Sequence, residues 1–435
     1  MLARILLLSA AVLFLPNHYA VASSHGQTSS QNKKAPSYSV AEYNEYMTAA
    51  QLKNPEQRLG ALDRFVAMYP HSALLPFAYE TYYSTYAEMK KHTKTIEYAD
   101  KFLTLQSNAK PTAQLRALAA RTRAFELSSA DGDSIDQARF QRARDHAIEA
   151  ITLLGKIPKP ENVSATQFEQ EKRTARAFYE YAVGYADLGL KDYGSAVQHL
   201  QFAASVNADD PLIFYQLGIA DLGMNPPSYL DGFWALARSV ALNGPNATQA
   251  KAYLRNQLLR YQQCACQDLI EDQITALIAK AGTQPIRPAA LDIPSAEELQ
   301  KVRESTGPIL DELRTNSEHA QKVWLADCGL EFPEVAVKIL SVSKEGDVVV
   351  LKSFRGPTIE EMRRVTEPNM EIRVSGQPDV ERLKTGDWVR FHGTLTALQR
   401  DPFLLRWEKA QINPQDIPAE VVKKPRKRMT RKQKN

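Results

Sequence analysis

Few residues in this chain have the types and spacing that local catalytic motifs require. The stretch GYADLGLK, which begins at Gly184, has the two glycines of a phosphate-binding loop, but Leu190 stands where that motif needs lysine. Neither a G-x-S-x-G nucleophile turn nor an H-E-x-x-H metal motif occurs among the 435 residues. The sequence therefore predicts no catalytic residue, no cofactor and no metal ion. An enzyme whose site is assembled from distant residues stays an alternative, because such a site leaves no local motif.

The chain has three cysteines, at positions 264, 266 and 328. Residues two apart on a helix point about 200° apart, so a bond between Cys264 and Cys266 is not expected. Either of them can pair with Cys328 if the fold brings the two together, and the alternative is three buried or partly buried thiols. A zinc site is disfavoured, because zinc motifs usually place two to four residues between neighbouring ligands and here there is one.

The last thirteen residues, KKPRKRMTRKQKN, are strongly basic and contain no acid. Runs of this kind bind polyanions such as nucleic acid, anionic lipid or polysaccharide, or serve as nuclear import signals. The alternative is a charge run that only improves solubility. The predicted polyanion-binding residues are Lys423, Lys424, Arg426, Lys427, Arg428, Arg431, Lys432 and Lys434.

The N-terminus has the layout of a secretory signal peptide. Arg4 precedes an apolar run from Ile5 to Leu15, and small residues at Ala20 and Ala22 precede Ser23. The run is shorter than the roughly 20 residues that a membrane-spanning helix needs. We therefore expect cleavage after residue 22 and export to the periplasm or the cell exterior, with possible attachment to the envelope and no transmembrane segment afterwards.

The basic character of the sequence lies in its C-terminal tail. The whole sequence has a formal charge of +4, with 54 basic and 50 acidic residues. Without Arg4 and the eight tail cations, 45 basic residues face 50 acidic ones, which leaves residues 23–422 with a net charge of −5. Export excludes the nuclear import machinery as the partner of the tail, and an anionic envelope surface is the better-matched polyanion.

An internal repeat organises the helical part of the sequence. Gly184 and Gly218 lie 34 residues apart, and Ala186 and Ala220 keep the same offset. Within the first unit, three further small or apolar residues lie 12, 16 and 19 positions after Gly184. These are Ala196, Leu200 and Ala203.

These spacings resemble the tetratricopeptide repeat family. The resemblance implies a solenoid of stacked helix pairs, in which the small residues lie where two helices approach most closely. The second unit departs from the pattern, because the expected small residue falls two positions late at Gly232, after the insertion Asn225-Pro226-Pro227. Residues 111–177 fit the repeat poorly.

The resemblance also implies a groove lined by the first helix of each pair. The matching positions are Phe178, Tyr181, Tyr185, Leu188, Leu212, Tyr215, Ile219 and Leu222. Family members that grip a terminal carboxylate use Lys, Arg and Asn at such positions, and here the residues are aromatic or aliphatic. The expected partner is therefore a protein or peptide with an apolar or aromatic segment. The alternative is that the chain's own helices cover these side chains, which would make them part of the core.

The C-terminal part alternates with a period of two and predicts five strands. The segments are VAVKILSV, DVVVLKSF, MEIRVSG, DWVRFHGTL and FLLRWEKAQI. Their number and the glycine-rich fourth strand resemble a small OB-like barrel. Barrels of that type often bind oligonucleotides, for which Trp388, Arg390 and His392 would be the candidate residues. Export and the acidic body argue against nucleic acid as a partner.

The sequence thus predicts an α+β multidomain protein that resembles exported bacterial tetratricopeptide-repeat proteins with a C-terminal OB-like domain. We expect a non-enzymatic scaffold that binds a protein partner, with polyanion binding through barrel and tail as the first alternative. The predicted parts are a signal peptide (1–22), a polar tether (23–37), an α-solenoid (38–282), a linker with helices (283–325), a small β-barrel (326–415) and a basic disordered tail (416–435).

Overall fold

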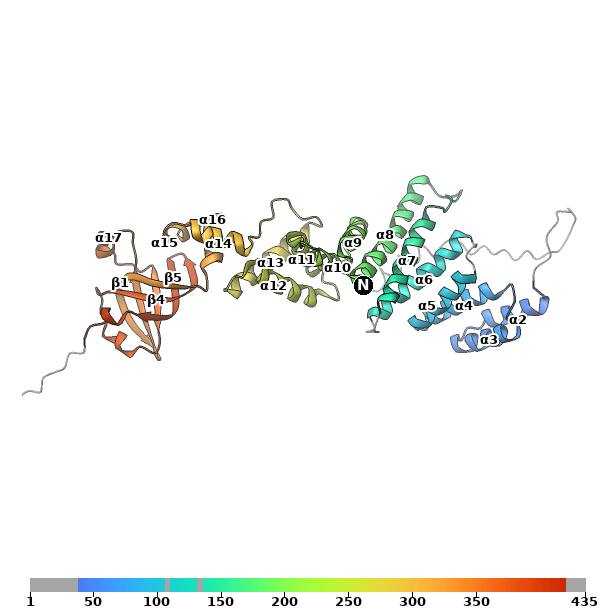
Figure 1. The fold of residues 1–435 in the computed structure, drawn as a ribbon, viewed down its shortest axis with the longest axis horizontal. Helices are drawn as coiled ribbons and strands as arrows, with labels where there is room; N and C mark the ends of the chain where they lie inside the picture. The colour runs from blue at the N-terminus through green and yellow to red at the C-terminus, as the bar shows by residue number, and fades with distance from the viewer. Residues whose placement is uncertain (1–37, 106–109, 131–135, 420–435) are drawn as a thin grey trace, which may run out of the picture. The chain divides into compact units, whose positions relative to one another are not determined.

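The computed structural model of the chain describes residues 38–105, 110–130 and 136–419. It contains a helical repeat region followed by a closed five-stranded β-barrel, as predicted (Figure 1). The predicted signal peptide, tether and eight tail cations lie outside the described residues. No helix in the described part of the chain is long and apolar enough to span a membrane.

Consecutive helices of the repeat region pack in pairs. Each pair has a first and a second helix, and the pairs follow one another along the chain (Figure 1). The five pairs in the described residues are α2 (Val40–Ala50) with α3 (Pro55–Met68), α4 (Leu75–Glu88) with α5 (His92–Leu105), α6 (Pro111–Ala130) with α7 (Gln137–Leu154), α8 (Ala165–Leu190) with α9 (Tyr193–Val206), and α10 (Pro211–Gly223) with α11 (Tyr229–Ala241). Helices α12 (Ala247–Gln262) and α13 (Gln267–Thr283) follow.

Polar residues just before the helices fix where they begin. Ser39 forms a capping box with Glu42 at the start of α2, and Ser164 accepts a hydrogen bond from the Gln167 amide at the start of α8. Asp210 caps α10 in the same way, directly before a proline at the first helical position. These caps satisfy backbone N–H groups that have no partner within the helix.

The repeat glycines lie where the two helices of a pair touch. A Cβ atom at Gly184 would lie 2.6 Å from Leu200 Cγ, and one at Gly218 would lie 2.7 Å from Leu236 Cγ. Both glycines are buried, and the two helices of each pair approach closely at these positions. The other predicted packing residues are buried as well, namely Ala186, Ala196, Leu200, Ala203 and Ala220.

The two-residue insertion also lies where the sequence places it. Only residues 191–192 separate α8 from α9, whereas residues 224–228 separate α10 from α11. The leucine that packs on the repeat glycine therefore shifts by 36 residues, from Leu200 to Leu236, while the glycine shifts by 34. Gly232 takes the place of Ala196, with its carbonyl oxygen 3.1 Å from a Cβ atom at Gly218. The longer turn thus changes the spacing without changing the packing.

The chain divides into two compact units. The first comprises Met1–Lys251 and Leu277–Ala289, and the second comprises Ala252–Ala276 and Ala290–Asn435. The chain therefore leaves the first unit within α12, returns to it within α13, and leaves it again before α14.

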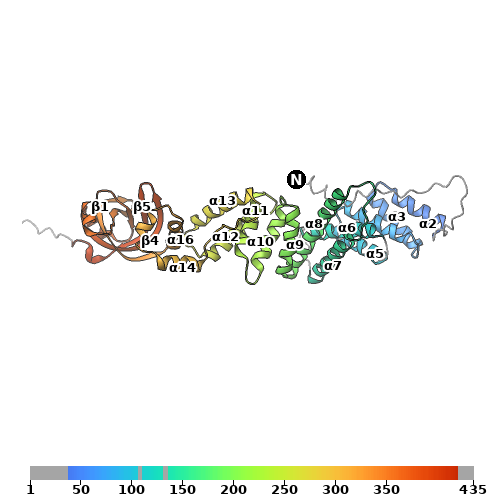
Figure 2. The same cartoon turned by 90° about the horizontal axis from the view of Figure 1, so that it is seen from above.

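The barrel is closed by its first and fourth strands. The strand order is β1-β2-β3-β5-β4, with β3 parallel to β5 and the other described pairs antiparallel. Figure 2 shows the same strands from above, curved around the barrel interior. The strands are β1 (Glu331–Glu345), β2 (Val348–Phe354), β3 (Met370–Val374), β4 (Trp388–Arg400) and β5 (Phe403–Ile412), and the short helix α17 (Ile359–Arg364) follows β2.

The barrel has an apolar interior because every second residue of its strands points inward. Trp407 is 1 % exposed, and the rings of Phe332 and Phe391 meet it edge-on at 5.2 and 5.4 Å. The 3-10 helix η1 (Pro378–Arg382) contributes Val380 to the same core, and α15 (Ile309–Leu313) contributes Leu313. Helices α14 (Ala296–Ser305) and α16 (Glu318–Asp327) precede β1.

A disulfide joins the loop between α12 and α13 to the residue after α16. It links Cys266 to Cys328, with Cα atoms 5.7 Å apart, which is one of the pairings that the sequence left open. Gly329 has a φ of +84°, and a Cβ atom there would lie 2.5 Å from Ala265 Cβ. Only glycine fits at such a backbone angle and distance. Cys264 is a buried free thiol.

Candidate functional site on the first helices of the repeat

The first helices of consecutive pairs contact one another directly. Contacts join α2 to α4, α4 to α6, α6 to α8 and α8 to α10. We define the first-helix face as the set of residues that bridge these neighbouring first helices. At the α2–α4 step, the Tyr46 hydroxyl lies 3.4 Å from Thr81 Oγ1, and the Tyr46 ring lies 6.4 Å from Phe77. At the α4–α6 step, Arg116 donates to Glu80 at 2.9 Å.

The α6–α8 step of this face holds a polar cluster. Arg123 on α6 donates from Nη1 to Glu126 Oε2 at 3.1 Å, and the other carboxylate oxygen of Glu126 is buried without a hydrogen-bond partner. Tyr181 on α8 and Asp210 before α10 interact electrostatically with Glu126. We call Arg123, Glu126, Tyr181 and Asp210 the Glu126 cluster. Its members come from two successive first helices, α6 and α8, and from the N-cap of the next one, α10.

Burial dominates the protonation of this cluster. The Glu126 side chain is 11 % exposed, and burial raises its pKa to about 7, against the lowering effect of Arg123 and with a small further rise from Asp210. Burial also raises the pKa of Tyr181 well above its usual value, and the charges of Glu126 and Asp210 add to this. Tyr181 is therefore a neutral hydroxyl at physiological pH, while Glu126 exchanges its proton near neutrality.

The eight predicted groove residues lie on α8 and α10, and none of them is exposed. Tyr185 packs edge-on against Phe125 and Phe140 of the preceding pair, at 6.2 and 6.1 Å, and stacks on Tyr181 at 6.4 Å. Leu222 is 9 % exposed and touches Gly232. The other six are partly buried, namely Phe178, Tyr181, Leu188, Leu212, Tyr215 and Ile219.

Much of the predicted stripe therefore packs against the protein itself. Phe178 packs against the core between α6 and α8, and Leu188 packs against the core between α9 and α10. The sequence placed the binding surface on α8 and α10. Charged side chains of the first-helix face lie earlier in the chain, among them those on α6 of the preceding pair. Three charged members of this face, Arg116, Arg123 and Glu126, belong to residues 111–177, which fit the repeat poorly. The available signal was the i, i+3 spacing of Arg123 and Glu126, which is common on ordinary surface helices.

A second polar group lies between the helices of the α8–α9 pair. Ser195 Oγ donates to Asp187 Oδ2 at 2.6 Å, and His199 Nδ1 lies 2.5 Å from Glu180 Oε2. Arg176 holds the other oxygen of Glu180 at 2.8 Å. A nucleophilic serine needs a base that accepts its proton, and here the serine donates to a carboxylate while the histidine is held by a different one. This group joins helices and has no arrangement for nucleophilic catalysis.

The barrel residues suggested for nucleic-acid binding are partly committed to other contacts. Arg390 donates to both carboxylate oxygens of Asp416, at 3.0 and 3.1 Å. His392 borders a shallow hollow together with Glu331 and Glu334, whose charges repel phosphate. Trp388 is 40 % exposed. This combination offers one aromatic ring but no excess of positive charge, which is a poor match to a nucleic-acid groove.

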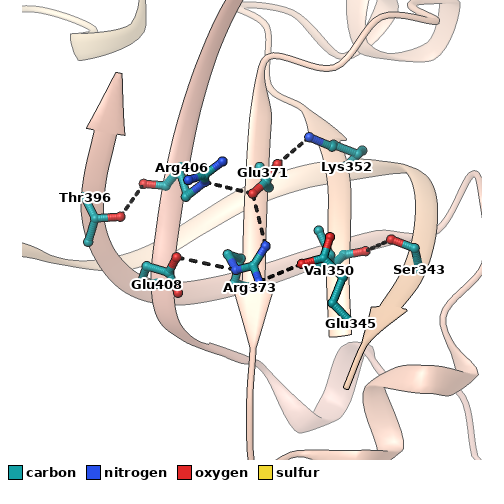
Figure 3. Close-up of polar contacts among 9 residues, drawn as sticks. All are labelled: Ser343, Glu345, Val350, Lys352, Glu371, Arg373, Thr396, Arg406 and Glu408. Atoms are coloured by element: carbon teal, nitrogen blue, oxygen red, sulfur yellow. Dashed lines mark hydrogen bonds and ion pairs between the residues drawn. The ribbon is translucent and has the colours of Figure 1, made fainter. Parts of the chain in front are cut away.

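The outer surface of β2, β3 and β5 carries a network in which basic side chains pair with carboxylates (Figure 3). Glu371, with a side chain 7 % exposed, receives hydrogen bonds from Lys352, Arg406 and Arg373. Arg373 also pairs with Glu345 at 2.8 Å and with Glu408 at 3.4 Å. Three cations thus face three carboxylates, so this surface has no net charge with which to attract a polyanion.

No group of three or more His, Cys, Asp or Glu residues that could hold a metal ion occurs in the described part of the chain. No protein-family model matches the sequence, and none of the curated proteins compared with it matches significantly. Among solved structures, the chain is similar to the crystal structure of the apo form of RapI, at 13 % sequence identity and a TM-score of 0.32. The match covers 61 % of this chain and 100 % of that one. We take no function from so distant a likeness.

Proposed function

We propose that the chain is an exported scaffold protein that binds a protein partner through its first-helix face and has no catalytic activity of its own. The observation that carries this proposal is the first-helix face itself. Successive first helices lie in contact and present aromatic rings beside polar groups, including a carboxylate oxygen without a partner. Repeats stacked in this way bind extended segments or amphipathic helices along one face.

Export is supported by the predicted signal peptide and by the disulfide. A bond between Cys266 and Cys328 persists in an oxidising compartment such as the periplasm or the cell exterior, and is rare in the cytosol. The absence of a catalytic role is supported by the contacts of the strongest candidates. Ser195 and His199 each bind a different carboxylate, and the exposed barrel charges neutralise one another.

The proposal is tested with two exposed apolar residues on different helices. Phe77, 39 % exposed, belongs to the first-helix face, and Met68, 53 % exposed, belongs to the second helix α3. Phe77→Asp and Met68→Asp chains are used as bait in envelope extract, and captured proteins are compared with those of the wild-type chain. We expect Phe77→Asp to lose a captured protein that Met68→Asp retains. Equal capture by all three chains, with helical circular dichroism intact, would contradict binding through the first-helix face.

A further inference from the structure

We infer that the Glu126 cluster is the binding position for one cationic side chain, a lysine or an arginine, of the partner polypeptide. This inference rests on the proposed function and adds the chemistry of the partner. It starts from an imbalance of charge and hydrogen bonding. Glu126 and Asp210 supply two carboxylates, whereas Arg123 is the cation that pairs with Glu126. One buried oxygen of Glu126 has no donor at all.

A buried carboxylate oxygen without a donor has a free-energy cost that a ligand can remove. Burying a charged acceptor without a hydrogen bond is unfavourable, and the raised pKa of Glu126 has the same physical origin. A lysine ammonium has three donors and an arginine guanidinium has five. Either group matches a site that offers carboxylate oxygens and the Tyr181 hydroxyl. An anion would meet two carboxylates here and is excluded by repulsion.

The surroundings also fit the rest of such a side chain. Tyr181 stacks on Tyr185, whose ring meets Phe125 and Phe140. Lysine and arginine bury their aliphatic stems along apolar surfaces while the charged end reaches polar groups. A cation near aromatic rings gains further attraction. A metal ion fits less well, because Glu126 and Asp210 belong to no group of three His, Cys, Asp or Glu residues that could hold one in the described part of the chain.

The inference predicts a defined pH dependence. The folded free protein has a Glu126 pKa of about 7, and the cation binds the ionised form. Lowering the pH from 8 to 6 protonates Glu126, so the affinity should fall about tenfold if ionised Glu126 is required. The Asp210→Asn chain should bind more weakly at both pH values, because an asparagine still caps α10 but carries no charge.

The test uses the full chain and a phage library of random twelve-residue peptides as the probe. Selection on the wild-type chain at pH 8 is followed by sequencing and by titration of single peptides. We expect enrichment of peptides with one Lys or Arg among apolar residues. Replacing that residue with Gln, or binding the peptide to Glu126→Gln, should each lower the affinity at least tenfold. In a double-mutant comparison the two losses should not add, because they remove the same contact.

Glu97→Gln is the matched control. It removes one negative charge from α5, the second helix of its pair, where Glu97 pairs with Lys94 and Lys101. This variant should bind the peptides as the wild type does. Glu126→Gln should fold, because a neutral amide is easier to bury than an unpaired carboxylate, and its melting temperature checks this.

Three results would overturn the inference. If the enriched peptides contain no basic residue and fail to bind the Phe77→Asp chain, the proposed function stands and the cation site is refuted. No enrichment over an unrelated protein would contradict both. Unchanged affinity in Glu126→Gln, with the peptide's lysine still required, would place the cation elsewhere on the molecule.

Discussion

Buried carboxylates recur at one position of the repeat, and their partners differ. Asp187 and Asp221 are 34 residues apart, and both are at most 3 % exposed. Asp187 accepts a hydrogen bond from Ser195 and pairs with Arg144 at 2.8 Å. The insertion in the second pair places Asp231 where Ser195 lies in the first. A carboxylate therefore faces a carboxylate, and burial together with Asp231 raises the pKa of Asp221 to about 7, against the effect of Arg287.

The stability of the protein should depend on pH through Asp221. Its pKa is about 7 in the folded chain, whereas an aspartate exposed to water in the unfolded chain has a pKa of 3.8. The folded state therefore holds this proton more tightly than the unfolded state. Its contribution to stability is therefore present at low pH and is lost as the pH rises to about 7. Asp221→Asn should be more stable than the wild type at pH 8, with a smaller difference at pH 5. Urea unfolding at both pH values measures this, and identical pH profiles would refute the assignment.

The close approach at Gly184 predicts a second effect at the residue scale. In Gly184→Ala, the new methyl group would lie 2.6 Å from Leu200 Cγ, so the free energy of unfolding should fall by about 1–3 kcal/mol. Gly194→Ala is the control, because a Cβ atom there has no neighbour within 4 Å and alanine favours a helix by up to about 1 kcal/mol. Chemical denaturation of both variants measures the difference. A Gly184→Ala chain as stable as Gly194→Ala would contradict the packing described.

At the scale of elements, the spacing of apolar and polar residues in the sequence predicts which segments form helices and which form strands. The helix pairs, the insertion after α10 and the five strands could all be predicted, because each depends on local spacing, caps and alternation. The strand order and the parallel pairing of β3 with β5 depend on contacts between distant residues, which local patterns do not contain. The same reason explains the Glu126 cluster. Its members come from two helices and the N-cap of a third, and their meeting is set by how the pairs stack.

The link between Cys266 and Cys328 predicts a defined thiol count. The unreduced chain in denaturant should react with one equivalent of a thiol reagent, from Cys264, and the reduced chain with three. Cys266→Ser with Cys328→Ser removes a 62-residue closed loop and should lower stability by about 2–4 kcal/mol. Cys264→Ser should leave one disulfide and no free thiol. Three reactive thiols in the unreduced protein would contradict this pairing.

At the scale of the whole molecule, charge separates into a mildly acidic body and a basic C-terminus. Residues 23–422 carry a net charge of −5, whereas residues 423–435 carry eight cations. The barrel surface in Figure 3 is neutral overall, and Arg390 is paired with Asp416. Interaction with polyanions is therefore expected from the C-terminus, and protein binding is the function proposed for the helical part. The two activities should be separable by truncation.

A chain that stops at Val422 tests this separation. Retention on heparin at low ionic strength should be lost in the truncated chain, because unscreened contacts between tail cations and sulfates are responsible for it. The full chain should elute with salt. Retention that survives truncation would assign polyanion binding to the barrel, and Trp388→Ala with Arg390→Ala would then identify the surface.

The measurement that tests the central claim most directly is site-specific photo-crosslinking in the host cell. A photoreactive amino acid is placed at positions 77 and 123 on the first-helix face, and at the similarly exposed positions 68 and 148 on second helices. Binding through the first-helix face predicts crosslinks to one common protein from positions 77 and 123, and none to that protein from positions 68 and 148. Crosslinks to that protein from the second helices alone would show that the opposite surface is the binding one.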